Sequence, residues 1–156
     1  MDFELVEKQI LERLQEKITD EDIKFFTMPE YDDDVQTKLP FKERWLITAF
    51  AGEEAEKDPA DVGMSVQHTE VIFTVLIKGK TLYGASGIYG LEHQVKKAII
   101  GLRAIDGEKF RYAGFKFVDR VNGVFMYAVD FKTRAVVQEE IPDEEGPYFT
   151  RLTITE

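Results

Sequence analysis

The sequence contains no cysteine in its 156 residues. This absence excludes disulfide bonds, thiolate nucleophiles and zinc sites built on sulfur, and it is compatible with a reducing compartment. Histidine is nearly as scarce, since only His68 and His93 are present and they fall on different expected elements. The two serines, Ser65 and Ser86, fall in expected loops, and neither stands in a G-x-S-x-G motif. The sequence therefore has few residues for nucleophilic or metal chemistry.

Long apolar runs are absent too, because no stretch approaches the eighteen or so residues of a membrane span. The first four residues, MDFE, are acidic where a secretory signal would be basic and then apolar. We therefore expect a cytosolic protein, unless an assembly carries it elsewhere.

Positive charge is in deficit, because 20 Lys and Arg residues stand against 30 Asp and Glu residues, for a formal net charge of −10. An acidic surface repels the phosphate backbone, so tight nucleic-acid binding is disfavoured. An acidic lining would nevertheless suit a pore through which DNA slides without being gripped. Hydrophobic residues, at 44%, are sufficient for the core of one domain.

Three short motifs resemble binding sites but lack the spacing that such sites need. His68 and Glu70 could share one face of a strand, but two ligands without a third are more typical of a polar strand edge. The aspartates at positions 32–34 are consecutive, whereas an EF-hand alternates its ligands and ends on Glu. Residues 83–87 (YGASG) match neither phosphate-binding glycine motif and also suit a helix N-cap region. The sequence thus predicts no catalytic residue, no cofactor and no metal site.

The predicted fold depends on residues 71–77 (VIFTVLI), the one run that is apolar on both faces. β-Branched residues alternate there with Phe and Leu, so the run predicts a strand in the middle of a sheet. Helices can cover one face of that sheet, and a loop, a terminal arm or another copy of the chain can cover the other. We predict an α+β fold with a single mixed or antiparallel β-sheet and two α-helices packed on one face.

Apolar periodicity predicts the remaining elements. Helices are expected over residues 2–18, capped by Asp2, and over residues 88–102. Strands are expected over residues 23–28, 45–50, 67–79, 109–119 and 124–137. An Asn-Gly turn joins the last two strands, which is a strong hairpin signal.

Two features leave alternatives open. Lys96, Lys97 and Arg103 stand near the end of the second helix, where they either complement the helix dipole or form a basic patch for a partner. Trp45, the only Trp, is either buried or placed at an interface.

Two segments are candidate contact arms. Residues 52–66 are expected to form a long loop, and loops longer than about twelve residues are usually functional or mobile. Residues 138–147 are an acidic linker, and residues 148–154 alternate like a strand that folds back onto its own sheet or adds to that of a neighbouring subunit. We therefore divide the chain into a domain of residues 1–137 and an arm of residues 138–156. The candidate contact residues are Glu53, Glu54, Asp58, Asp61, Tyr148, Phe149, Leu152 and Ile154.

The order of these elements resembles that of the phage tail terminator, or tail completion, proteins of Mu-like prophages and myophages. The residues that carry the similarity are 71–77 (VIFTVLI), 87–91 (GIYGL), 95–102 (VKKAIIGL), 123–131 (GVFMYAVDF) and 133–134 (TR). The similarity covers most of residues 3–137 and is best from residue 69 onward. The acidic linker and the arm after Gln138 depart from the family pattern.

The resemblance implies a non-enzymatic assembly protein that caps the head-proximal end of a tail tube as a sixfold ring. Such a ring ends tube growth and offers a surface for head joining, so its partners are its own copies, the tail tube protein and a head-completion protein. DNA only passes through the ring, and neither a membrane nor a cofactor takes part. The protein would act in the host cytoplasm during assembly and then in the virion tail, and family members can stay monomeric until a tube end templates the ring.

Two other kinds of function are compatible with the sequence. A head-tail connector or a secretion-system adaptor of the same fold would also act through its surfaces. A small hydrolase or nucleotide-binding enzyme would need a pocket with converging polar groups, which the sequence does not reveal.

Overall fold

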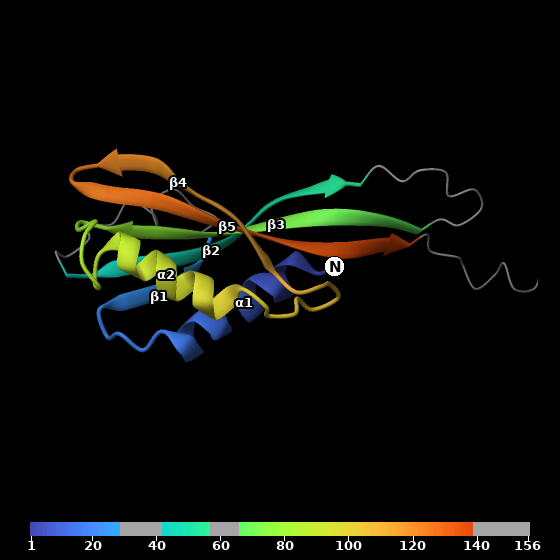
Figure 1. Ribbon diagram of the computed structural model, residues 1–156, viewed down its shortest axis with the longest axis horizontal. Helices are drawn as coiled ribbons and strands as arrows, with labels where there is room; N and C mark the ends of the chain where they lie inside the picture. Colours follow the sequence, from blue (N-terminus) through green and yellow to red (C-terminus); the bar gives the residue numbers. More distant parts are fainter. Residues whose placement is uncertain (29–41, 57–65, 139–156) are drawn as a thin grey trace, which may run out of the picture.

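A computed structural model of the protein describes residues 1–28, 42–56 and 66–138 (Figure 1). Two helices and five strands follow one another in these residues. They are α1 (Phe3–Lys17), β1 (Ile23–Thr27), β2 (Arg44–Ala55), β3 (Val66–Gly79), α2 (Ile88–Ile99), β4 (Arg111–Val121) and β5 (Val124–Gln138). Their order along the chain is the one predicted from the sequence.

The five strands form one mixed sheet with the spatial order β1-β2-β3-β5-β4. β1 runs parallel to β2, and the other neighbouring pairs are antiparallel. β3 therefore lies in the centre, as its two apolar faces predicted. Both helices pack on one face of the sheet (Figure 1), so the predicted α+β architecture is confirmed.

α1 forms because apolar residues recur along it every three or four positions. Asp2 caps the first turn, because its Oδ1 accepts a hydrogen bond from the backbone N–H of Leu5 at 3.2 Å. Val6, Ile10 and Leu14 have no exposed surface and form the stripe that faces the sheet. This stripe fixes the helix on the sheet.

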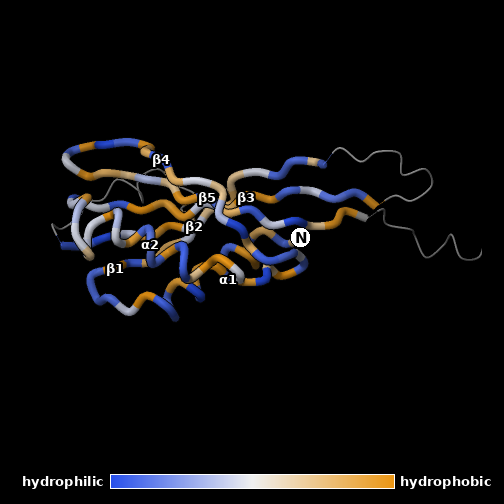
Figure 2. Tube along the Cα trace, in the orientation of Figure 1, coloured by the Kyte–Doolittle hydropathy of each residue, from blue (hydrophilic) through white to orange (hydrophobic). Residues whose placement is uncertain are grey.

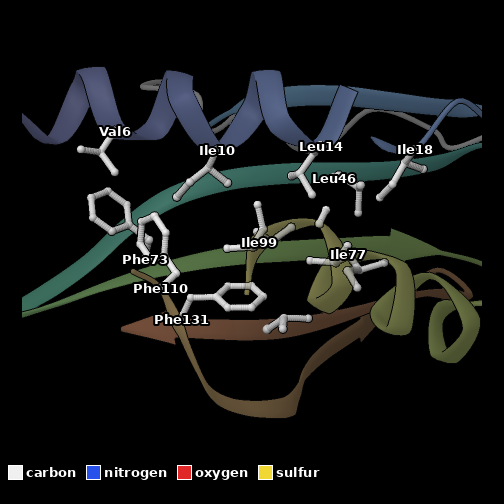
Figure 3. Packing of buried hydrophobic residues seen from close by; sticks show 14 of the residues in the cluster. Val6, Ile10, Leu14, Ile18, Leu46, Phe73, Ile77, Ile99, Phe110 and Phe131 are labelled. Atoms are coloured by element: carbon white, nitrogen blue, oxygen red, sulfur yellow. The ribbon is translucent and has the colours of Figure 1, made fainter. Parts of the chain in front are cut away.

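The hydrophobic core lies between the helices and the sheet (Figure 3). Phe73, at the centre of β3, is fully buried, and its ring meets those of Phe50 and Phe110 edge-on at centroid distances of 5.8 and 6.0 Å. The strands contain both hydrophobic and hydrophilic stretches (Figure 2), and the core residues of β3 occupy alternate positions: Val71, Phe73, Val75 and Ile77. The alternation places the aliphatic and aromatic side chains of one strand face under the helices.

β4 and β5 form the predicted hairpin. Asn122 and Gly123 adopt φ values of 52° and 77°, which fits a type I′ turn. Residues 125, 127, 129 and 131 of β5 contact the core on the helix side, as the alternating pattern predicted. The turn chemistry therefore sets which face of β5 is buried.

α2 is shorter than the sequence predicted. The expected helix continued to residue 102, but α2 ends at Ile99 and the chain turns at Gly101, whose φ is +87°. Phe110 then donates a backbone hydrogen bond to the carbonyl of Leu102 at 2.9 Å and accepts one from Gly101 at 3.1 Å. Pairing with a distant segment thus outweighs the helical periodicity of residues 100–102.

β2 is longer than predicted. Residues 52–55 and residue 66, which were expected in a loop, belong to strands. Residues 52–55 belong to β2 and pair with residues 69–72 of β3. A register shift between Phe50 and Gly52 marks a bulge where the polar part of the strand begins. The extension of β2 could not be predicted from an apolar pattern, because its residues lie beyond the helices (Figure 1) and therefore need not be apolar.

Candidate assembly surfaces

Of the groups considered as ligands, the aspartates at positions 32–34 lie outside the described residues, and Glu70 is engaged by neighbouring side chains. Among the described residues, no group of three or more His, Asp or Glu side chains could hold a metal ion. Glu70, the partner considered for His68, lies 3.3 Å from Nη2 of Arg111 and 3.5 Å from Nζ of Lys132. Because two cations contact its carboxylate, Glu70 fits the interpretation of an ordinary polar strand edge.

Backbone carbonyls of the preceding turn occupy the first N–H groups of α2. The N–H of Ile88 donates to the carbonyl of Thr81 at 2.9 Å, and that of Tyr89 donates to the carbonyl of Leu82 at 3.1 Å. Gly87 is the N-cap, and a Cβ on it would lie 2.4 Å from a backbone oxygen of this turn. The glycine-containing connection is therefore explained by its close contact with the helix, because a bound phosphate would need these amides free.

Parts of three strands extend beyond both helices (Figure 1). We call residues 52–55, 66–70 and 133–138, which pair side by side, the strand arm. Nε of Arg134 donates to both carboxylate oxygens of Glu56 at 3.1 Å, and its Nη2 donates to one of them at 2.9 Å. These bonds, and to a smaller extent the charge of Glu108, raise the pKa of the Arg134 guanidinium. The forked contact joins the end of β2 to β5 across the central strand.

The strand arm presents carboxylates and valines to solvent. Glu53 and Glu54, both predicted contact residues, are exposed, and Glu53 accepts a hydrogen bond from Oγ1 of Thr69 at 2.8 Å. Val136 and Val137 are about half exposed on the last part of β5. The strand arm therefore exposes both carboxylates and apolar side chains to a partner.

β4 is an edge strand that exposes large apolar side chains between charged ones. The exposed fractions are 44% for Tyr112, 55% for Phe117, 45% for Val118 and 56% for Val121. α1 packs mainly on β1 and β2 and α2 mainly on β3 and β5, so β4 lies beside the helix layer and not under it. Exposed apolar side chains grouped on an edge strand indicate a surface that another chain covers.

An aromatic cluster joins β4 and β5 to the start of α2; it consists of Tyr83, Tyr89, Phe115, Phe117 and Tyr127. The ring of Tyr127 lies 5.0 Å from that of Phe115, 5.5 Å from that of Phe117 and 5.9 Å from that of Tyr89. The hydroxyls of Tyr89 and Tyr127 are 3.4 Å apart, and this hydrogen bond raises the pKa of Tyr89. Tyr83 is 74% exposed, so the cluster reaches the surface with the aromatic groups that protein interfaces favour.

The sheet face opposite the helices carries a smaller apolar cluster. It comprises Trp45, Ile47, Leu76 and Val124. Trp45 is 8% exposed, which confirms the prediction of a buried Trp, and its Nε1 donates to Oε1 of Glu43 at 2.8 Å. Nζ of Lys78 lies 5.5 Å from the Trp45 ring, and burial lowers the pKa of this lysine.

The three cations considered near the end of α2 have different surroundings. Nζ of Lys96 lies 2.7 Å from Oε1 of the buried Glu92 and 4.9 Å from the centre of the Tyr112 ring. The hydrogen bond to Glu92 raises the pKa of Lys96. Lys97 and Arg103 are exposed. Lys96 is therefore committed to contacts within the chain, and of these three cations the other two are accessible to a partner.

The sequence matches the family model described as Gp37 protein over residues 10–156. The chain belongs to the Gp37 protein family. The fold of this Gp37-family chain is also similar to that of a chain in a solved virion of a native gene transfer agent (GTA) particle, with a TM-score of 0.52. The similarity covers 85% of this chain and 93% of that chain at 13% sequence identity, and it is a similarity of fold.

Two negative findings concern this Gp37-family chain. Comparison with curated proteins gives no match. Neither of the helices in the described part of the chain is long and apolar enough to cross a membrane.

The structure places two of the predicted contact residues of this Gp37-family chain, Glu53 and Glu54, on the strand arm. The others lie outside the described residues: Asp58, Asp61, Tyr148, Phe149, Leu152 and Ile154. The two fates considered for residues 148–154 therefore stay predictions. Sequence reasoning did not single out the β4 surface, although two helices over five expected strands already leave one strand to be covered.

Proposed function

We propose that this protein is a structural component of a phage or phage-like virion, where it caps the head-proximal end of the tail tube as a closed ring. The observation that carries the proposal is the fold shared with a chain of the gene transfer agent virion over nearly the whole length of that chain. The resemblance of residues 71–134 to tail terminator proteins supports the more specific role in ending tube growth.

The surfaces of the molecule support a role in assembly. The strand arm and the β4 edge expose apolar side chains at separate places on the same sheet. A ring built from heterologous contacts needs two different surfaces on each copy, and it presents further faces to the tube below and the head above. The formal net charge of −10 also suits a ring through which DNA passes without being held.

The proposed mechanism is geometric. One face of the ring fits the last ring of tube subunits, and the opposite face does not accept another tube subunit, so growth ends. The strand arm, with residues 57–65 that follow its β2 part, contacts the tube or the adjacent copy. The C-terminal arm at residues 148–154 adds a strand to a neighbour.

Tail tubes assembled with and without the protein test the proposal. Removing its gene from a producing strain is expected to give tubes of variable, excessive length in electron micrographs, and restoring the gene is expected to narrow the length distribution. Gold-labelled protein added to purified tubes should bind at one end only. Unchanged tube lengths without the gene would refute the capping role. Labelling at the head vertex instead of the tube end would identify a head-tail connector.

Deletion of residues 148–156 tests the role assigned to the C-terminal arm. The shortened chain is expected to remain a folded monomer, with the unfolding temperature of the full chain, but to occupy fewer tube ends. Equal occupancy by the two chains at matched concentration would show that the arm does not contribute to the ring.

A further inference from the structure

The helix layer is one strand narrower than the sheet. Strands lie about 4.8 Å apart and an α-helix is about 10 Å wide, so two helices cover about four strands. α1 and α2 pack mainly on β1, β2, β3 and β5. β4 lies beside the layer, where side chains of α2 reach Tyr112 and Phe115 but Tyr112 and Phe117 stay about half exposed. A third helix placed next to α2 would fill this position.

The register of the sheet aligns residues of β1, at one edge, with residues of β4, at the other edge, in straight rows across the strands. One continuous row of paired residues consists of Phe25, Leu46, Ile77, Tyr127 and Phe117. The adjacent row consists of Lys24, Trp45, Lys78, Met126 and Asp119. Because both rows run from β1 to β4, the outer strands of two copies can lie side by side without sliding along the strand direction.

The strand directions fit a repeating sheet. β1 runs in the direction of β2 and β5, whereas β4 runs opposite to β5. If a second copy continues the sheet with its helices on the same side, its β1 therefore meets β4 of the first copy in antiparallel orientation, which a backbone ladder accepts. Among the described residues, no strand pairs with the outer edge of β1 or of β4.

We propose that β4 of one copy pairs with β1 of the next copy in this unshifted register, so that the sheet continues from subunit to subunit. The inference rests on the proposed ring and names the contact that builds it. In this arrangement α1 of the next copy covers β4. Arg13 of α1 donates to the carbonyl of Ala98 in its own α2, and Gln9 donates to that of Arg103 just after α2. The half-buried Leu11 therefore lies on the opposite flank of α1, towards Phe117 of the neighbour.

Charge favours a second copy in this orientation over a two-fold pair. In the unshifted register the exposed Lys24 of one copy comes beside the exposed Asp119 of the other, so opposite charges meet. Pairing of β4 with β4 would instead bring together two strands that each carry three cations, Arg111, Lys116 and Arg120, and one anion, Asp119. The heterologous contact is therefore better matched, and it repeats around a ring instead of closing after two subunits.

The bulges of β4 limit the strength of the contact. Register shifts occur between Tyr112 and Gly114 and between Phe117 and Asp119. The regular ladder on β4 between these bulges is short, as is β1, so the two edges form few backbone hydrogen bonds. A contact of this size explains why free copies would remain separate until a tube end holds them together.

Disulfide cross-linking tests the register, and the cysteine-free sequence makes the test clean. The full-length double variant Lys24→Cys with Asp119→Cys is bound to tube ends and oxidised. We expect a ladder of covalent oligomers that ends in a closed ring, whereas each single-cysteine variant should stay monomeric. A control with cysteines at the exposed helix positions Lys17 and Lys97 should show no ladder.

The outcomes separate the contact from the function. Tube-end binding of the double variant without a cross-linked ladder would overturn the edge pairing and leave the capping role standing. Dimers from Asp119→Cys alone would show two-fold pairing of β4 and would also overturn it. A ladder formed by concentrated free protein that does not bind tubes would support the edge pairing and count against the capping role. Charge reversal gives an independent measurement. Lys24→Glu should lower tube-end occupancy about fivefold, and adding Asp119→Lys to that variant should restore it.

Discussion

Gly87→Ala is expected to destabilise the protein although it adds a single methyl group. A Cβ at this position would lie 2.4 and 2.5 Å from two backbone carbonyl oxygens and 2.6 Å from a carbonyl carbon. All three atoms belong to the backbone, so the contact is relieved only if the turn or the start of α2 moves. The φ of Gly87 is −81°, so crowding and not backbone strain causes the loss. Overpacking of this kind costs about 1–3 kcal/mol.

Thermal unfolding of the purified chain measures the effect. For a chain of this size, each kcal/mol lowers the unfolding midpoint by about 2–4 °C, so a decrease of about 2–12 °C is expected. Gly52→Ala is the matched control, because nothing lies within 4 Å of a Cβ there, and alanine is no worse than glycine within a strand. Equal midpoints for Gly87→Ala and the unmodified protein would refute the close packing of turn on helix. A decrease of the same size in Gly52→Ala would refute the assignment of the loss to that contact.

Three further predictions concern the core, the hairpin and the acid limit of stability. Phe73→Ala, at a fully buried position, should lower the free energy of unfolding in urea by about 3–5 kcal/mol. Phe117→Ala, on the exposed edge, should change that free energy little, and similar losses in the two variants would contradict the assigned core. Gly123→Val forces a branched side chain to a φ of 77° and should cost about 1–2 kcal/mol in the same assay, so an unchanged value would contradict the turn. Hydrogen bonds from the backbone N–H of Asp22 and from Arg44 lower the pKa of Asp20; its stabilisation is therefore present above the unfolded pKa and lost as the pH falls below about 4. Asp20→Asn should flatten this acid loss, and an unchanged pH profile would exclude that contribution.

The features that the sequence predicted best depend on local chemistry. Residues 71–77 are apolar on both faces because the helices cover one face of β3 and Leu76 joins the smaller apolar cluster on the other. Asn122 and Gly123 predicted the hairpin because they tolerate the positive φ values that a tight turn requires. Asp2 predicted the start of α1 because its side chain replaces a missing backbone partner. For the hairpin and the helix cap the decisive contact lies within a few residues along the chain, and for β3 the signal lies in its own seven residues.

The features that the sequence did not predict depend on contacts between distant segments. The last turn of the expected second helix is lost because Leu102 bonds to Phe110. Residues 52–55 join β2 because the long β3 offers them partners, although their composition is that of a loop. The exposed surface of β4 follows from how many strands two helices can cover. Such relations become visible only when the order of strands in the sheet is known.

The pairing of β3 with β5 affects how the chain folds during synthesis. These strands pair from Val66 and Gln138 at one end to Gly79 and Phe125 at the other, yet α2 and β4 lie between them in the chain. The central strand therefore leaves the ribosome well before its partner, and at about 5–20 residues per second the delay is roughly 3–12 s. During this delay an apolar strand edge is open to other nascent chains. The yield of folded protein is therefore expected to depend on chaperones that bind this edge, and on how quickly the final strand is translated.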